Sequence, residues 1–158
     1  MVTTKINIKP HLKEYLVGRW NNFDEKTPVH LPDQLDIYIL IWDLLVKRPI
    51  NCHIDSGNLE IVLPVRYGTK NPEYYNYLGI RSQKKIDKKI ELMMWADFRE
   101  FVESERQKGC SIIDAVSLFR SKYGIMSISE DALCKSYYRW RNRIQKREKR
   151  PYFSKKFQ

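Results

Sequence analysis

Apolar and polar residues alternate in a few short stretches of the first 64 residues. Residues 4–8 (TKINI) alternate, as do Val29 and Leu31 around His30, and both patterns predict short extended segments. Residues 59–63 (LEIVL) read as a further strand, which Pro64 ends. These segments are interleaved with helical patterns, so we expect a small sheet near the N-terminus.

Between and after these extended segments, apolar residues recur at helical spacing and predict three helices in the N-terminal half of the chain. The residues that recur at helical spacing between Leu12 and Trp20 predict an amphipathic helix over 10–20, with Pro10 at its first turn. Residues 33–47 are apolar almost all round, which favours a helix in the middle of the core. A buried strand is the alternative, but the length favours a helix. Asn71-Pro72-Glu73 is a good start for another short helix, over residues 71–78.

Three longer helices are predicted in the second half. One runs from a Ser82 cap to about Lys108, with a basic beginning and an acidic last third, an order that opposes the helix dipole. The next begins at a Ser111 cap and ends at Gly124. The last begins at a Ser129 cap and continues to about residue 147. The fold class we expect is therefore α+β and predominantly helical.

The domain organisation follows from these patterns. We expect an α+β subdomain over residues 1–68, a helical region over 69–150 and a short basic tail over 151–158, with one continuous domain as the alternative. The helical region would contain a pair of helices resembling a helix-turn-helix, 111–124 and 129–147, joined by a short turn with glycine.

The net charge of the chain is +10, and the positions of the charged residues say more about its function than this total does. Residues 135–158 hold ten Lys and Arg against one acid, and residues 81–89 hold five against one. The remainder of the chain is net acidic. A mildly acidic body with two basic segments indicates a polyanionic partner, which we take to be nucleic acid. The competing interpretation is an ordinary solvated face on a core helix.

The predicted helix 129–147 has an apolar stripe and a basic one. Leu133, Tyr137, Trp140 and Ile144 share the first, while Lys135, Arg139, Asn142 and Lys146 share the second. Since Arg and Asn can read guanine and adenine edges in the major groove of DNA, Arg139 and Asn142 are base-edge candidates. The candidates for phosphate contacts are Lys135, Arg143, Lys146, Arg147 and Arg150, with a second backbone contact from Lys84, Lys85, Lys88 and Lys89.

Two resemblances accompany these motifs. The segments DAVSLFRSKYGI and SYYRWRNR resemble the helix-turn-helix of transposases and related regulators, in which a second helix ends in a Tyr-Arg-Trp-like run. Here that run is Tyr138-Arg139-Trp140, although residues 125–133 lengthen the interval after the glycine. The segments LEIVLP, YYNYLG and EDALCKSYYRWR look like small uncharacterised proteins of phages and mobile elements in gut bacteria. The first resemblance implies a DNA-binding protein, whereas the second supplies a biological context and no mechanism.

Other nucleic-acid and protein partners stay open. Exposed aromatics near basic residues could stack single-stranded DNA or RNA bases. We expect most of the tyrosines near the basic segments to pack in the core, with Tyr138 partly exposed. A different alternative is an assembly or adaptor protein, such as a phage structural component, whose basic helix docks on an acidic partner. The sequence does not determine the oligomeric state, and a homo-oligomer is one of the states it allows.

No motif indicates catalysis, so we expect neither an enzyme nor a cofactor. Cys52, His53 and Asp55 lack the spacing of a zinc site, and a Cys–His nucleophile pair in a loop is very weak evidence. Three cysteines without a CxxC pattern indicate a reduced, cytoplasmic chain. The N-terminal segment does not resemble a signal peptide, and the longest apolar run is far shorter than the about 20 residues that span a bilayer. We therefore expect no membrane association.

Overall fold

A computed structural model describes residues 1–66, Gly68 and residues 70–149 of the chain. Within these residues, the elements follow in the order β1 (Thr3–Ile6), α1 (Pro10–Trp20), α2 (Asp36–Leu44), β2 (Leu59–Val62), α3 (Ile80–Gln107), α4 (Ile112–Tyr123) and α5 (Glu130–Glu148). The predicted fold class, α+β and mostly helical with a small N-terminal sheet, is confirmed. Arg150 and the predicted tail over 151–158 lie outside the described residues.

The sheet consists of two antiparallel strands. Thr3 pairs with Val62 and Ile6 with Leu59, so that Ile6, Leu59 and Ile61 are buried. Val29 adds a single parallel bridge to the other edge of β2, through its own N–H and the N–H of Val62. The third extended segment expected from the sequence is thus present as one bridge.

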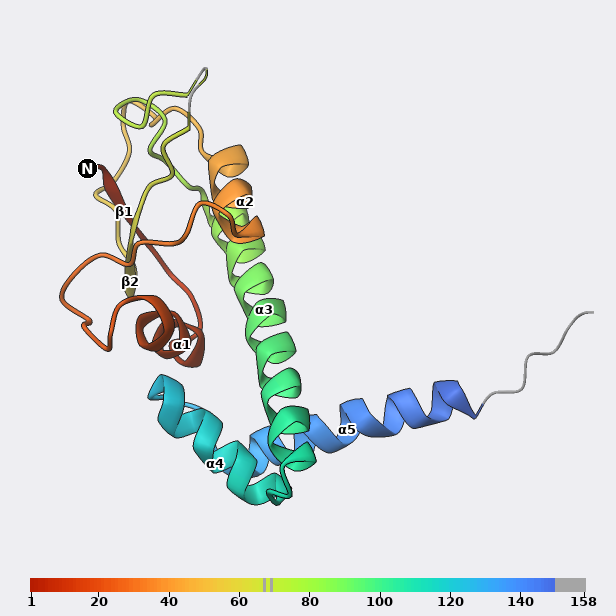
Figure 1. The fold of residues 1–158 in the computed structure, drawn as a ribbon. Helices are drawn as coiled ribbons and strands as arrows, with labels where there is room; N and C mark the ends of the chain where they lie inside the picture. The colour runs from red at the N-terminus through yellow and green to blue at the C-terminus, as the bar shows by residue number, and fades with distance from the viewer. Residues whose placement is uncertain (67, 69, 150–158) are drawn as a thin grey trace, which may run out of the picture.

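The long helix α3 is the support on which the rest is assembled (Figure 1). Its 28 residues give it a length of about 42 Å. α2 packs near its start, α1 along its middle, and α4 and α5 near its end. The buried stripe that receives them recurs at every fourth residue: Ile86, Ile90, Met94, Phe98 and Val102.

Aromatic side chains link the helices through the core. The ring of Phe98 in α3 meets Phe119 in α4 at a centroid distance of 5.1 Å and Tyr137 in α5 at 6.5 Å, both edge to face. Tyr123 then joins α4 to Tyr15 of α1 at 5.2 Å. The same continuous cluster of buried residues extends from Ile6 to Tyr137, so the sheet and the C-terminal helices share a core.

Two predicted elements of the N-terminal half differ in the structure. α2 is shorter than residues 33–47 and lies at the side of the core: Ile37 and Ile41 are buried, whereas Ile39 is 38% exposed. It ends at Leu44 because Val46 exchanges two backbone hydrogen bonds with Tyr77, each 3.2 Å long. The same bridge explains why residues 71–78 make only a turn and no helix, since Tyr77 is extended.

The helix ends in the second half follow the sequence closely. The Ser111 and Ser129 hydroxyls accept hydrogen bonds from the N–H groups of Asp114 and Ala132, each 3.2 Å long, as N-caps do. Gly124 has φ 64°, the left-handed conformation expected after a helix. α3 begins at Ile80, two residues before the predicted cap.

Among the described residues, no helix is long and apolar enough to cross a membrane.

Candidate nucleic-acid interface

The N-terminal half of α5 is anchored to the body. Leu133 and Tyr137 are fully buried, and the Tyr137 hydroxyl donates a hydrogen bond to Glu103 of α3. Arg120 of α4 contacts Glu130 at 3.2 Å, which ties the first turn of α5 to the preceding helix. The direction in which α5 leaves the body is therefore set by packed contacts with both neighbouring helices.

The turn before α5 is held from a third side, by Glu14 of α1. Its carboxylate accepts hydrogen bonds from the N–H groups of Met126 (2.9 Å) and Ser127 (3.0 Å) and from the Ser127 hydroxyl (2.7 Å). Burial opposes ionisation of Glu14, but these hydrogen bonds outweigh burial and hold the pKa of its carboxyl below the usual value. The orientation of α5 thus depends on α1, α3 and α4 together.

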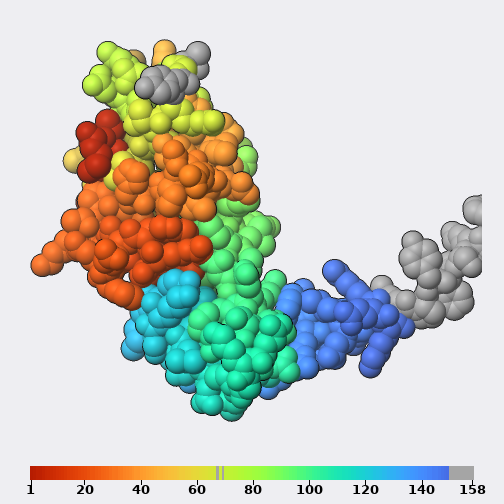
Figure 2. All heavy atoms as spheres, viewed as in Figure 1, coloured from red at the N-terminus to blue at the C-terminus, as the bar shows by residue number. Residues whose placement is uncertain are grey.

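The C-terminal half of α5 projects away from the body as a free helix (Figures 1 and 2). We call residues 139–149 the basic arm. It carries six Lys and Arg against one acid, Glu148. In the space-filling view only its inner end meets the body. Most of its side chains are exposed, and these include Arg139, Asn142, Arg143, Lys146, Arg147 and Lys149.

The basic stripe predicted on α5 is exposed along its whole described length. Lys135, Arg139, Asn142 and Lys146 all face solvent. Lys135 alone among them has a carboxylate partner within the described residues, Asp131 at 2.8 Å one turn earlier. Since Lys135 is locally neutralised, the unpaired positive charge begins at Arg139. The acidic first turn of α5, Glu130 and Asp131, lies at the opposite end of the helix from that charge.

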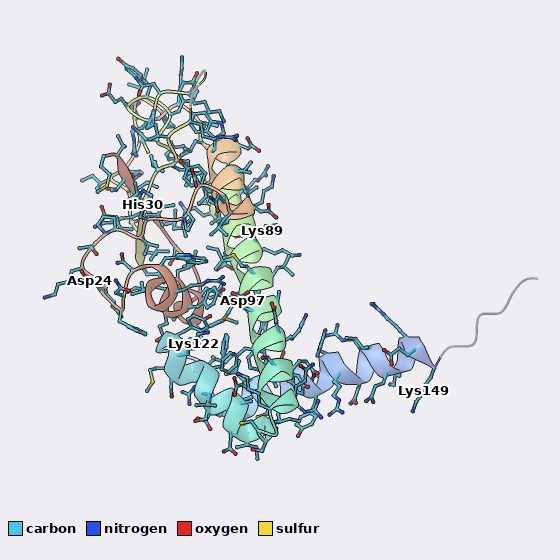
Figure 3. All side chains as sticks on the ribbon, in the orientation of Figure 1. Asp24, His30, Lys89, Asp97, Lys122 and Lys149 are labelled. Carbon is cyan, nitrogen blue, oxygen red and sulfur yellow. The ribbon has the colours of Figure 1, made fainter. Side chains whose placement is uncertain are left out.

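The second predicted basic segment lies at the other end of α3. Lys84, Lys85 and Lys88 are exposed, and Lys89 is half-buried with its ammonium 3.4 Å from Asp36 of α2. Figure 3 shows Lys89 on the upper part of α3 and Lys149 near the far end of α5, so the two basic segments are well separated. A ligand that touched both would have to extend along α3.

Sequence reasoning did not name two arginines of α3 as site residues: Arg81, at the start of the second basic segment, and Arg99, which lies between the two segments. Arg81 and Arg99 share one stripe of α3 with Lys85 and Lys88, because the four are spaced at i, i+4, i+7 and i+18. Arg99 lies against α5, with its guanidinium carbon 5.4 Å from the ring centroid of Trp140. The spacing could have been read from the sequence, but the contact with Trp140 could not.

Few of the aromatic side chains near the basic arm are exposed enough to stack on nucleic-acid bases. Tyr137 is buried, and Tyr138 is 47% exposed, both as expected. Tyr74 is 65% exposed, which the sequence did not predict, because residues 71–78 form a turn. Tyr138 is therefore the most exposed aromatic side chain close to the basic arm in the described part of α5, since Trp140 is half-buried.

The cysteine and histidine residues form no recognisable reactive site in the part of the chain that the structure describes. All three cysteines are free, and no group of three His, Cys, Asp or Glu residues could hold a metal ion there. The Cys52 thiol donates to the backbone oxygen of His53 at 3.3 Å. The Arg48 guanidinium binds Asp55 with two hydrogen bonds of 3.0 and 2.7 Å and holds this loop in place.

Comparisons with known proteins add no relative to this description. No protein-family model, curated protein or solved structure matches the chain. A functional assignment therefore depends on the geometry of the basic arm and of the α3 stripe.

Proposed function

We propose that the chain binds duplex DNA through the basic arm, as a non-enzymatic regulatory or accessory protein of the kind that phages and mobile elements carry. The observation that carries this proposal is the projection of the arm. A helix that leaves the body with five exposed Lys and Arg beyond its anchored half is open to a ligand around most of its circumference. Its charge would attract phosphates and release their counterions.

The dimensions of the arm suit the major groove. An α-helix with side chains is about 10–12 Å across, and the groove of B-DNA is about 12 Å wide. Arg139 and Asn142 lie on the exposed stripe; the Arg139 guanidinium can donate to a guanine edge, and the Asn142 amide can donate to and accept from an adenine edge. Arg143, Lys146 and Arg147 flank them and would contact phosphates on either side.

The aromatic residues favour a duplex over a single strand. Single-strand binding proteins place several exposed aromatic rings beside a basic groove. Within the described part of the basic arm, Trp140 is covered on one side by Arg99, and Tyr138 lies one residue before the arm begins.

The free cysteines are consistent with a reducing compartment, so we propose the cytoplasm as the location of the protein.

The test is a fluorescence-anisotropy titration of labelled duplex DNA over a series of salt concentrations. We expect binding that weakens steeply with salt, with single-stranded DNA and RNA of the same sequence bound less tightly. Absence of binding at low salt, or a flat salt dependence, contradicts the proposal. A defined oligomer by light scattering, free of nucleic acid, would instead favour an assembly or adaptor protein.

Base recognition is tested separately from phosphate binding. Arg139→Ala and Asn142→Ala should reduce the ratio of specific to non-specific affinity on sequences selected from a random pool. The matched control is Arg66→Ala, which removes an exposed arginine from the loop after β2, at the end of the molecule opposite α5. If all three variants keep the ratio of the wild-type chain, the arm does not read bases.

A further inference from the structure

The crossing of α3 and α5 contains an arginine whose charge is not compensated by any described carboxylate. Arg99 is half-buried, and among the described residues no carboxylate oxygen lies within 4.0 Å of its guanidinium. Its Nε atom is buried and has no hydrogen-bond acceptor in the part of the chain that the structure describes. A buried, unsatisfied donor on a charged group is costly and rare in a folded protein.

The charges around Arg99 increase this cost. Burial, and then the positive charge of Arg143 on the basic arm, lower the pKa of the Arg99 guanidinium below its usual value, although arginine remains charged. The nearest acid on the same face one turn later, Glu103, is already engaged by Arg106 and by the Tyr137 hydroxyl. Arg143 lies three residues beyond Trp140, the residue of α5 on which Arg99 packs, so the two arginines belong to the same part of the crossing.

Packing on Trp140 accounts for only part of this arrangement. A guanidinium over an indole ring is attracted weakly to the face of the ring. The contact orients the guanidinium plane but leaves its positive charge without an anion. Trp140 itself is fixed by Tyr137, whose ring centroid is 5.7 Å away, so the position of Arg99 is well defined before any ligand arrives.

The position of Arg99 in the fold points to a shared ligand. It lies on the stripe of α3 that carries Arg81, Lys85 and Lys88, at the level where α5 crosses. About 16 Å of helix separates it from Lys88. Figure 1 shows the basic arm leaving α3 at a wide angle, and Arg99 lies where the two helices cross. A polyanion that followed both helices would pass this crossing.

We propose that Arg99 and Arg143 form a phosphate-binding site at the α3–α5 crossing, which holds one backbone phosphate of the DNA bound along the basic arm. The inference rests on the proposed function and adds α3 to the interface. Guanidinium groups suit this role because their planar donors bind phosphate oxygens in pairs. The phosphate would compensate the charge of Arg99 and screen it from Arg143.

The test compares Arg99→Gln and Arg143→Gln with Arg66→Gln, which removes the same charge far from the crossing. Each of the first two should weaken duplex binding about tenfold and lower the salt-dependence slope by about 0.9, the value for one lost phosphate contact. The double variant should lose less affinity than the two single losses combined, because both residues share one phosphate. Arg99→Lys should not restore the affinity fully, since lysine cannot bind in the paired geometry.

Folding is checked separately. Arg99→Gln should unfold at the same urea concentration as the wild-type chain or a higher one, because it removes an uncompensated charge. Arg143 is exposed on the arm, so Arg143→Gln reports on the site even if Arg99→Gln is unstable. In NMR spectra, the Nε–H signal of Arg99, assigned by its loss in Arg99→Lys, should shift when duplex DNA is added.

The outcomes separate this inference from the proposed function. If the wild-type chain binds no nucleic acid, the proposed function fails and this site fails with it. If the wild-type chain binds DNA but Arg99→Gln and Arg143→Gln match Arg66→Gln in affinity and slope, only the phosphate site is overturned. An Arg99 signal that stays unshifted at saturating DNA would overturn it as well.

Discussion

The hydroxyl of Tyr137 in α5 donates a hydrogen bond to the carboxylate of Glu103 in α3. The guanidinium of Arg106 donates to the same hydroxyl at 3.0 Å and lies 3.5 Å from Glu103. The Tyr137 ring is fully buried against Phe98. This group of three side chains fixes α5 on α3 just before the basic arm begins.

Removing the hydroxyl should loosen that attachment. Tyr137→Phe keeps the ring but deprives Glu103 and Arg106 of a partner, so we expect the free energy of unfolding to fall by about 1–2 kcal/mol. Urea denaturation followed by circular dichroism measures the change. Tyr138→Phe is the control, because Tyr138 is half-exposed and makes no hydrogen bond within the described residues. Equal midpoints for the two variants would show that the hydroxyl contributes nothing.

Alkaline pH should destabilise the fold through Tyr15. Burial raises the pKa of the Tyr15 phenol well above its usual value near 10, and its hydroxyl donates to Asp97 while Arg19 contacts it. The folded state therefore keeps a proton that the unfolded state loses. Stability is fully present below the unfolded pKa and falls as pH rises above about 10, by up to about 1.4 kcal/mol per pH unit from this residue.

The measurement is urea denaturation of the wild-type chain and Tyr15→Phe between pH 8 and 11. Other groups titrate in this range, so the difference between the two proteins isolates Tyr15. We expect the variant to lose stability less steeply above pH 10. Parallel curves for the two proteins would mean that Tyr15 ionises equally in both states.

Gly18 should resist substitution because α1 and α4 touch there. A Cβ atom at Gly18 would lie 2.2 Å from the carbonyl oxygen of Tyr123 and 2.8 Å from its carbon, so the two helices would have to separate. We expect Gly18→Ala to destabilise the fold by about 1–3 kcal/mol despite the higher helix propensity of alanine. Differential scanning calorimetry tests this against Gly79→Ala, where the nearest atom would be 3.8 Å away. A Gly18→Ala protein as stable as the control would refute the close contact.

The lysines of α3 should contribute to DNA binding without affecting the fold. Lys85 and Lys88 are exposed on the same stripe as Arg99. Replacing both with Gln should lower the salt-dependence slope of duplex binding by about 1.8, because each phosphate contact contributes about 0.9. Lys5 and Lys26 are exposed elsewhere, and the double replacement Lys5→Gln, Lys26→Gln serves as control. A slope equal to that of the control would restrict the interface to α5.

Local signals in the sequence were sufficient for most helix ends. Ser111, Ser129 and Gly124 act within a few residues of themselves, through caps and a left-handed turn, so their roles could be predicted without the rest of the chain. The same applies to α1, whose limits at Pro10 and Trp20 match the prediction. By contrast, α2 is a helix as predicted but is shorter than expected, and the helix predicted over 71–78 is wrong, because the bridge between Val46 and Tyr77 joins segments about 30 residues apart.

For the candidate interface, the sequence by itself determined which residues are charged, the separation of the basic segments, and the shared stripe of Lys135, Arg139, Asn142 and Lys146. Helical periodicity relates residues within one helix, so this much needs no tertiary structure. Only the tertiary structure decided that Arg139 and the rest of the basic arm project from the body, and that Arg99 packs on Trp140. Those relationships depend on the direction in which α5 leaves the body, which Glu14, Glu103 and Arg120 set from three different helices.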